Sequence, residues 1–244
     1  MAVLEAREIS VRFGGHMAVD GFNLSVEPGE ITGLIGPNGA GKTTTFNVFT
    51  GLLAPTRGRV LLEGNDITKV AAHRRSKLGM ARTFQRLELF GSLSVRDNVL
   101  TAAELAGHVD GSPSERTDQI LERAGMTALA GERAELLSTG NARLVELARA
   151  LASNPRVLLL DEPASGLDEV ETDRFATLLA ELAGEGLAVL LVEHDVPLVM
   201  RLCRSVTVMN FGRVLAAGSA EEIRQDQAVV DAYLGQASDV GAST

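Results

Sequence analysis

The sequence predicts an α/β protein that has a largely parallel core sheet, a small antiparallel sheet near the N-terminus and a helical insertion. Two continuous apolar runs, at residues 157–160 and 187–192, suit parallel strands buried on both faces. A helix-length segment at residues 169–182 joins them, and the three together make a βαβ unit. Between residues 93 and 153 apolar side chains recur at helical spacing instead, so the insertion is expected there.

The N-terminal part of the chain alternates apolar and polar side chains, as strands with one buried face do. We expect strands at residues 3–11 and 22–26, with a turn at Gly14-Gly15 between them. Residues 58–64 form a further predicted strand, which a turn at residues 64–66 closes. Together these segments predict a small, mostly antiparallel sheet beside the core.

Residues 36–43, Gly-Pro-Asn-Gly-Ala-Gly-Lys-Thr, lie between a predicted strand at residues 31–35 and a predicted helix at residues 42–52. Strand, loop and helix are the context in which G-x-x-x-x-G-K-[ST] binds nucleotide phosphates. The glycines let the backbone N–H groups converge at a helix N-terminus, which carries partial positive charge. Lys42 adds a full charge for the β- and γ-phosphates, and the Thr43 hydroxyl is placed to hold Mg²⁺. A ligand-free glycine turn is the less favoured alternative. The expected nucleotide-binding residues are Gly36, Asn38, Gly39, Ala40, Gly41, Lys42, Thr43 and Thr44.

Two acidic residues, Asp161 and Glu162, follow the apolar run at residues 157–160. Ligands of open α/β sheets bind where buried parallel strands end. Asp161 is therefore placed to hold Mg²⁺, directly or through water, across from Thr43. Glu162 is placed to polarise a water for attack on the γ-phosphate. The alternative is that both acids simply end a strand in solvent.

In the predicted insertion, helices are expected at residues 95–106, 115–124 and 142–152, with a loop at residues 107–113. Ser138 or Thr139 is a suitable N-cap for the third helix. The functional alternative is that the Ser138 hydroxyl and the Gly140 N–H face a phosphate.

Two polar residues end strand-like segments near the predicted site. Gln85 follows Arg82-Thr-Phe, and its neutral amide could bind Mg²⁺ or orient water, although a surface-loop role is the simpler interpretation. His194 follows the run at residues 187–192 at the same sheet edge as Asp161, where it could donate a hydrogen bond to the γ-phosphate. A lone histidine at a strand end is otherwise usually a surface residue.

The C-terminal part of the chain continues the α/β pattern. A short helix is expected at residues 196–203, and strands at residues 205–209 and 213–217. Ser219 with Glu222 three residues later predicts a capping box at the start of another helix. One or two further helical turns at 229–234 precede a frayed tail.

Along the chain the order is phosphate loop, Gln, Leu-Ser-x-Gly, Asp-Glu-Pro, Ser-Gly-Leu-Asp and a strand-end His. This order resembles the ATP-binding cassette (ABC) ATPases over residues 2–235. The resemblance implies a RecA-like P-loop NTPase core with an N-terminal antiparallel β subdomain and an inserted helical subdomain. On this basis residues 1–236 form a single ABC ATPase domain. Within it the core and β subdomain take residues 1–86 and 154–236, the helical subdomain takes residues 87–153, and residues 237–244 are a flexible tail.

The resemblance also implies roles for single residues. Phe13 corresponds to the aromatic that stacks on adenine, with a buried strand position as the alternative. Gln85 corresponds to the Q-loop, which senses Mg²⁺ and contacts the membrane subunit. Residues 137–141 correspond to the signature motif, which binds the γ-phosphate of ATP held by another protomer. Asp168 corresponds to the D-loop and His194 to the switch histidine. The implied catalytic residues are Glu162, His194 and Gln85, and the implied Mg²⁺ ligands are Thr43, Gln85 and Asp161.

The segment at residues 137–141, named the signature segment from here on, departs from the usual Leu-Ser-Gly-Gly-Gln. Thr139 replaces the first glycine and Asn141 replaces the glutamine, while Ser138 and Gly140 remain. A bulkier third residue occurs in some ABC branches, so Thr139 does not predict an inactive cassette. These two residues are nevertheless the only support for a non-hydrolysing regulatory subunit.

A finer resemblance is to the ATPase subunits of branched-chain amino-acid importers, whose related branches serve urea or short amides. It implies ATP, Mg²⁺, a second ATPase subunit and transmembrane permease subunits as ligands and partners. The segments that carry it are residues 81–85, 88–90, 192–195, 198–200, 212–216 and 232–235.

Composition limits the remaining choices. The net charge is −9 without a distinct basic cluster, so no nucleic-acid partner is expected. The single cysteine, Cys203, excludes an internal disulfide and suits a small buried position. No signal peptide or membrane-spanning run is evident, so we expect a soluble chain held peripherally at the cytoplasmic face of the inner membrane by its partners.

Besides a non-hydrolysing regulatory subunit, two rival functions are open. A soluble ABC ATPase of repair or translation usually has two cassettes or long coiled-coil insertions, neither of which is present. A P-loop kinase or GTPase would explain residues 36–43 but not the signature segment or His194, and no Asn-Lys-x-Asp guanine motif occurs.

Overall fold

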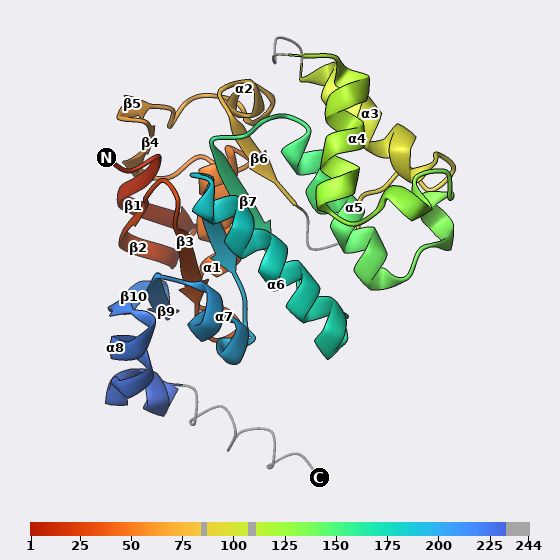
Figure 1. Cartoon of the computed structure of the whole chain (residues 1–244). Coiled ribbons are helices and arrows are strands. Elements are labelled where there is room, and N and C mark those ends of the chain that lie inside the picture. The colour runs from red at the N-terminus through yellow and green to blue at the C-terminus, as the bar shows by residue number, and fades with distance from the viewer. Residues whose placement is uncertain (84–86, 107–110, 233–244) are drawn as a thin grey trace.

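The computed structural model of the chain describes residues 1–83, 87–106 and 111–232. In this part of the chain two β-sheets lie on one side and a group of helices lies on the other (Figure 1). The arrangement confirms the predicted α/β class, with an antiparallel β subdomain and a helical insertion.

The larger sheet has five parallel strands and one antiparallel edge strand, β10. Strands β3, β7 and β8 are buried at every position, which confirms the prediction from their apolar runs. Helix α6 (Glu169–Gly184) connects β7 to its neighbour β8, as the βαβ prediction requires. In sheet order the strands are β10 (Arg213–Ser219), β9 (Ser205–Asn210), β3 (Ile31–Ile35), β8 (Ala188–Val192), β7 (Val157–Asp161) and β6 (Met80–Arg82).

The smaller sheet is antiparallel and has the order β2-β1-β4-β5. Two of its features differ from the sequence prediction. The strand expected from residue 22 begins at His16, because the tight hairpin pairs Phe13 with His16. Irregular register along the hairpin and Gly21 with φ of 62° break the alternation on which the prediction relied. The strands are β1 (Leu4–Phe13), β2 (His16–Val26), β4 (Arg57–Leu62) and β5 (Asn65–Asp66).

The turn expected at residues 64–66 lies one residue earlier. Glu63 and Gly64 both have positive φ angles, 48° and 77°, and make the reversal. Residues 65 and 66 then pair with β4 as the short strand β5.

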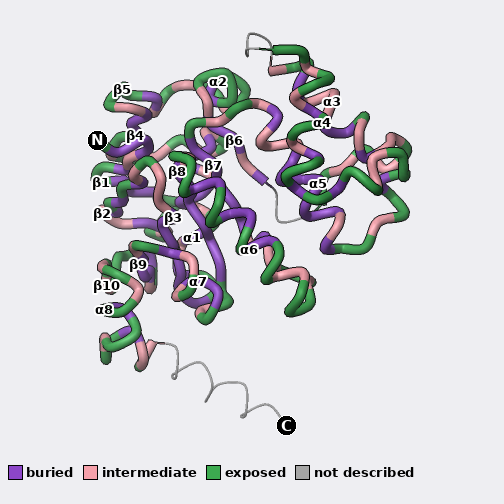
Figure 2. Tube along the Cα trace, viewed as in Figure 1, coloured by how far each residue is buried: buried purple, intermediate pink, exposed green. Residues whose placement is uncertain are grey.

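Helix α1 (Lys42–Thr50) packs between the two sheets. Its phenylalanines Phe46 and Phe49 are fully buried there, and the Phe49 ring meets Phe22 of β2 edge to face at 6.5 Å between centroids. This apolar core fixes the helix that follows the glycine-rich loop, and it appears as the purple interior on the β side of Figure 2.

A second apolar core covers the other face of the larger sheet. It unites α6 and α7 (Val196–Leu202) with three helices that the sequence predicted in the insertion. These three, named the helical group from here on, are α3 (Val95–Leu105), α4 (Pro113–Arg123) and α5 (Thr139–Leu151). Two short 3₁₀ turns, η1 (Thr127–Leu129) and η2 (Ala134–Leu136), connect α4 to α5.

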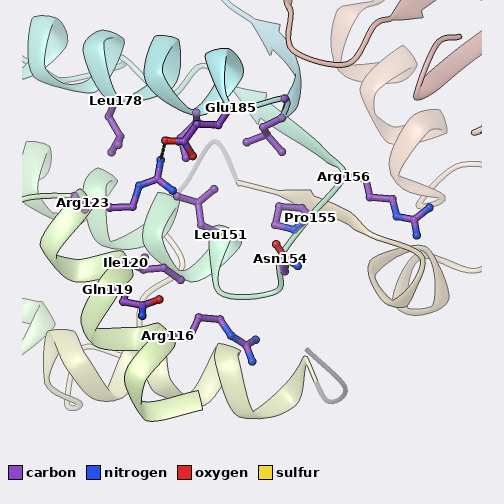
Figure 3. Close-up of a pocket in the computed structure, with 14 residues that line it drawn as sticks. Arg116, Gln119, Ile120, Arg123, Leu151, Asn154, Pro155, Arg156, Leu178 and Glu185 are labelled. Carbon is purple, nitrogen blue, oxygen red and sulfur yellow. Dashed lines mark hydrogen bonds and ion pairs between the residues drawn. The ribbon is translucent and has the colours of Figure 1, made fainter. Parts of the chain in front are cut away.

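Polar contacts join the helical group to the core around a cavity of about 410 Å³ (Figure 3). Arg123 of α4 forms an ion pair with Glu185 at the end of α6, with 2.8 Å between Nη2 and Oε1. Arg116 donates from Nη1 to the carbonyl of Ala152, which is the C-cap of α5, at 3.1 Å. Arg123 and Arg116 therefore attach α4 to α6 and α5.

Helix α2 (Ala72–Lys77) was not expected, because six mostly polar residues have no usable periodicity. Its Arg75 is buried and donates to four backbone carbonyls, those of Thr68, Val70, Val48 and Phe49. The last two carbonyls are in the final turn of α1, so α2 secures the end of that helix.

The C-terminal part follows the prediction closely. Ser219 and Glu222 form the expected capping box of α8 (Ala220–Gln225). Residues 227–232 are helical, whereas residues 233–234 of the predicted terminal turn lie outside the described residues. No helix in the described ranges is both long and apolar enough to cross a bilayer.

Candidate nucleotide-binding site

The phosphate loop, residues 36–43, leads from β3 into α1 and lies against β9 and β2. A Cβ at Gly36, where φ is 149°, would lie 2.2 Å from the carbonyl oxygen of Met209. A Cβ at Gly41, where φ is 105°, would lie 2.8 Å from the carbonyl oxygen of Ala18. Neighbouring backbone thus excludes any side chain at these two positions, which explains two glycines of the motif.

Lys42 is the first residue of α1 and is buried. Its Nζ donates to the carbonyl oxygens of Gly36, at 2.5 Å, and Pro37, at 3.1 Å. Burial lowers the pKa of Lys42, and the charges of Glu162 and Asp161 oppose that decrease. The ammonium group is therefore held over the loop, within reach of the charge of both predicted acids.

The other loop residues differ in accessibility. Asn38, Gly39 and Thr43 are exposed, and Thr44 is half-buried, whereas Ala40 is buried. The Ala40 carbonyl accepts a hydrogen bond from the Gly212 N–H at 3.0 Å, which ties the loop to the β9–β10 turn. The exposed side of the loop is the side on which a triphosphate can lie.

Asp161 is the last residue of β7 and is buried. Burial raises the pKa of Asp161, as does the adjacent charge of Glu162, while Arg82 and Lys42 act in the opposite direction. The structure therefore places Asp161 at the carboxyl edge of the sheet beside the lysine of the phosphate loop, as the sequence predicted.

Glu162 and His194 come together from neighbouring strand ends. Their side chains approach to 3.6 Å between Glu162 Oε1 and His194 Nδ1, and His194 is 60% exposed while Glu162 is 21% exposed. Glu162 has a left-handed backbone with φ of 49°, which is uncommon for a residue other than glycine. Its N–H donates to the carbonyl of Val192 at the end of β8, at 2.8 Å. The His194 imidazole therefore lies beside Glu162 at the sheet edge, with Glu193 Oε2 4.0 Å from the same Nδ1.

Glu193 was passed over in the sequence analysis, although it precedes His194. Its side chain is 1% exposed. One carboxylate oxygen accepts from the Ala164 N–H at 2.9 Å and the other from the His194 N–H at 3.1 Å. Burial raises the pKa of Glu193 against the effect of these hydrogen bonds. It fastens the loop after β7 to the end of β8, and the signal for it was an acid directly after an apolar strand.

The signature segment lies at the N-terminus of α5, in the helical group (Figure 1). Ser138 is the N-cap, and its Oγ accepts from the Asn141 N–H at 3.3 Å, which confirms the predicted capping role. The Ser138 hydroxyl also donates to Glu171 of α6, at 3.3 Å. Gly140 is buried beneath the Glu171 carboxylate. The neighbours of Ser138 and Gly140 thus belong to α6.

Asp168 is the N-cap of α6 and forms a capping box with Glu171. Phe13 ends β1 and is 52% exposed, so the alternative of a buried strand aromatic is wrong. Phe211, which no motif indicated, is 88% exposed beside Gly212, the residue tied to the phosphate loop. Gln85 lies outside the described residues, so its predicted roles stay predictions.

Comparison with known sequence families places the chain. The ABC transporter family matches residues 19–165, which is more than half of the sequence. The chain belongs to this family. The family of branched-chain amino acid ATP-binding cassette transporters matches residues 213–239 as well.

Curated relatives agree over nearly the whole length. The high-affinity branched-chain amino acid transport ATP-binding protein BraF of Pseudomonas aeruginosa is 40% identical, with 96% of this chain and 98% of the relative covered. The protein LivG of Escherichia coli, which has the same description, is 39% identical with the same coverage. The lipopolysaccharide export system ATP-binding protein LptB of Acidithiobacillus ferridurans is 37% identical, with 96% and 97% covered.

Solved structures show the same fold. The ADP conformation of an ATP-binding cassette of an ABC transporter superposes with a TM-score of 0.87 at 31% identity, covering 96% of this chain and 99% of that chain. A dimeric post-hydrolysis cassette bound to ADP and Pi superposes with a TM-score of 0.79 at 25% identity, covering 89% and 98%. The chain is thus an ATP-binding subunit of the ABC transporter family, whose characteristic activity is ATP hydrolysis. The kinase and GTPase alternatives are excluded.

Proposed function

We propose that this subunit hydrolyses ATP at a site that it completes with a second cassette, and that hydrolysis powers the import of branched-chain amino acids or related small polar solutes. The supporting observation is the division of the predicted site residues between two places. Lys42, Asp161, Glu162 and His194 gather at the sheet edge, whereas Ser138 contacts α6. Residues at the second place serve the nucleotide of the other cassette.

The phosphate loop binds the triphosphate of its own subunit. Gly39 leaves the exposed side of the loop backbone accessible, and Lys42 neutralises charge on the β- and γ-phosphates. The exposed Phe13 stacks on the adenine, a contact worth about 0.5–1.5 kcal/mol. Burial of the ammonium strengthens its attraction for phosphate, because water screens it less.

Thr43 and Asp161 would hold Mg²⁺. Hydroxyl and carboxylate oxygens are the hard donors that Mg²⁺ prefers, and it commonly takes one or two carboxylates together with substrate phosphates. When bound, Mg²⁺ would neutralise phosphate charge and orient the phosphates. Gln85 is proposed as a further ligand.

Glu162 polarises the attacking water, and His194 donates a hydrogen bond to the γ-phosphate. Because their side chains approach to 3.6 Å, Glu162 can contact the water while His194 contacts the γ-phosphate that this water attacks. Positioning of the water by Glu162 carries most of the effect.

Two cassettes, identical or paralogous, meet head to tail in this proposal. Ser138 and Gly140 of one face the γ-phosphate held by the other, and Asp168 lies at the interface. ATP joins the halves because its charge needs donors from both, and hydrolysis removes that link. The dimeric cassette described above supports this arrangement by similarity.

The membrane subunits are proposed to dock beside β6. A mainly apolar cavity of about 200 Å³ lies there between α1, α2 and β6, and Leu52, Met80 and Arg82 line it. Leu78, between α2 and β6, is exposed, as are Leu87 and Phe90 further along the chain. Exposed apolar side chains beside a cavity are typical of interaction sites. Docking there would hold the subunit at the cytoplasmic face of the membrane.

The importer assignment rests on similarity to BraF and LivG and on the match at residues 213–239. The relative LptB favours lipopolysaccharide export as the second candidate. Purification of the tagged subunit from its native membranes identifies the permease proteins that come with it. Export-type partners would reverse the assignment, and recovery of no membrane protein would favour a soluble ABC ATPase.

The composite site is tested in the Glu162→Gln background, in which ATP should accumulate in a dimer. Adding Ser138→Arg should prevent that dimer while the monomer still binds ATP. Ser25→Arg, on an exposed position of β2, is the control and should leave the dimer intact. Formation of a dimer despite Ser138→Arg would contradict the composite site.

A further inference from the structure

We propose that Glu171 is a positioning residue of the composite ATP site, because its carboxylate fastens the signature segment to the start of α6. The two elements that face the nucleotide of the other cassette would then move as one unit. The inference rests on the proposed function, since it concerns the same site.

The contacts of Glu171 join two helix N-termini. Its Oε1 accepts from the Ser138 hydroxyl at 3.3 Å, and its Oε2 accepts from the Asp168 N–H at 3.2 Å. In return the Glu171 N–H donates to Asp168 Oδ1 at 2.8 Å. One side chain therefore completes the capping box of α6 and orients the hydroxyl that caps α5.

Gly140 shows how closely the carboxylate approaches α5. A Cβ at this position would lie 2.1 Å from the Glu171 Cδ and 2.2 Å from its Oε1. Gly140 is helical and lacks a positive φ, so a side chain there would conflict only with the Glu171 carboxylate and would displace it. In this subunit the glycine therefore makes room for Glu171, apart from any contact with a phosphate.

Thr139 lies near the same junction. A Cβ at Gly166, two residues before Asp168, would lie 3.4 Å from the Thr139 Cγ2. The residue that departs from the usual signature sequence therefore faces the loop that leads into α6.

A carboxylate also suits this place electrostatically. The first turns of α5 and α6 both present partial positive charge, which a negative side chain stabilises. Glu171 can therefore hold the two helices in place before a phosphate arrives. A Ser138 hydroxyl in a fixed orientation loses less entropy when it binds the phosphate of the other cassette.

The experiment uses the Glu162→Gln chain and measures the ATP concentration that gives half-maximal dimer, by light scattering after size exclusion. Glu171→Ala should raise that concentration at least about fivefold, the equivalent of one lost hydrogen bond. Glu171→Gln keeps one acceptor oxygen, so its ATP concentration for half-maximal dimer should lie between those of the parent and of Glu171→Ala. Binding of a fluorescent ATP analogue to the monomer should not change, because the phosphate loop is untouched.

Glu222→Ala is the matched control. Glu222 forms the same kind of capping box, with Ser219 of α8, where Ser219 N–H donates to its Oε2 at 2.7 Å. Its removal should lower the thermal unfolding temperature as Glu171→Ala does, while the dimer forms at the ATP concentration of the parent. If loss of helix capping alone weakened the dimer, both variants would need the same increase in ATP concentration to form it.

Three outcomes overturn the inference. A dimer that forms in Glu171→Ala at the parent ATP concentration removes the positioning role while the proposed function stands. A dimer that forms at lower ATP would mean that the carboxylate only repels the phosphate. Failure of the Glu162→Gln parent to dimerise with ATP would overturn the proposed function itself, and this inference with it.

Discussion

His194 Nδ1 lies 3.6 Å from Glu162 Oε1, which brings together the residues that follow two neighbouring parallel strands. The contact depends on backbone as well as side chains. Glu162 is held in a left-handed conformation by its hydrogen bond to Val192, and buried Glu193 fixes the His194 N–H. The acid and the imidazole are therefore both oriented by backbone contacts at the sheet edge.

Replacing Glu162 with glutamine should reduce ATP hydrolysis by about 10²-fold or more, because the amide cannot polarise water as a carboxylate does. ATP binding should persist, since Lys42 and the loop amides are unchanged. Phosphate release and nucleotide binding are measured on the same preparation. Glu169→Gln, an exposed acid at the start of α6, is the control and should hydrolyse ATP normally. Unchanged hydrolysis in Glu162→Gln would remove its assigned role.

Two glycines of the phosphate loop should respond differently to alanine. At Gly36 the new Cβ would lie 2.2 Å from the Met209 carbonyl oxygen, so either β9 or the loop must move. At Gly39 a Cβ meets nothing within 4 Å, and only the φ of 81° opposes it, at a cost of about 1–2 kcal/mol. We expect Gly36→Ala to lower the unfolding temperature much further than Gly39→Ala, as calorimetry would measure. Equal losses would show that conformation, not space, selects both glycines.

Much of the fold follows from local pattern. The strands β3, β7 and β8 are continuous apolar runs, and α3, α5 and α6 have clear helical periodicity, so their prediction needed no knowledge of the tertiary structure. The elements that were missed or misplaced are those that the rest of the molecule imposes. The start of β2 depends on hairpin pairing, and α2 depends on the burial of one arginine.

The site residues also fall into those that the sequence predicts and those that depend on the tertiary structure. Lys42, Asp161 and His194 could be placed together from the sequence, because parallel strands deliver their carboxyl ends to one edge. Glu171 and Glu193 could not, since the groups that they hold, the Ser138 hydroxyl and the Ala164 N–H, lie about thirty residues away and no spacing rule indicates them. The position of Glu193 directly after an apolar strand is a weak signal in a chain with net charge −9.

Arg75 should be the most costly residue of α2 to remove. Its buried guanidinium donates to four carbonyls, two of them in the last turn of α1. Burial lowers the pKa of Arg75 to about 10, still well above neutrality, so the group remains charged. Arg75→Ala should reduce the free energy of unfolding by about 3 kcal/mol or more, because the carbonyls lose their partners.

The matched control for that variant is Arg74→Ala, next to it on the exposed side of α2, which should cost less than about 0.5 kcal/mol. Arg75→Lys should behave more like the alanine variant, since an ammonium cannot reproduce the planar fork of donors. Urea unfolding of the three variants measures the differences. Equal stability of Arg75→Ala and Arg74→Ala would mean that water replaces the guanidinium.

Cys203 should remain unreactive at a pH that ionises ordinary thiols. Burial raises the pKa of Cys203 from its ordinary 9.0 to about 12, and the charge of Glu193 adds to the increase. Since the folded pKa is the higher one, the contribution of this thiol to stability is present below about pH 9 and is lost as the pH rises towards 12.

A thiol reagent at pH 8.5 should therefore label the native chain no faster than it unfolds, because the thiolate is the reactive form. The same reagent should label the chain at once in denaturant. Ser25→Cys supplies an exposed thiol on the same molecule, and it should react at the rate of a free cysteine. Rapid labelling of both thiols in native protein would show that the packing of Cys203 against β3 opens without unfolding, and that the strand before the phosphate loop is less fixed than its burial indicates.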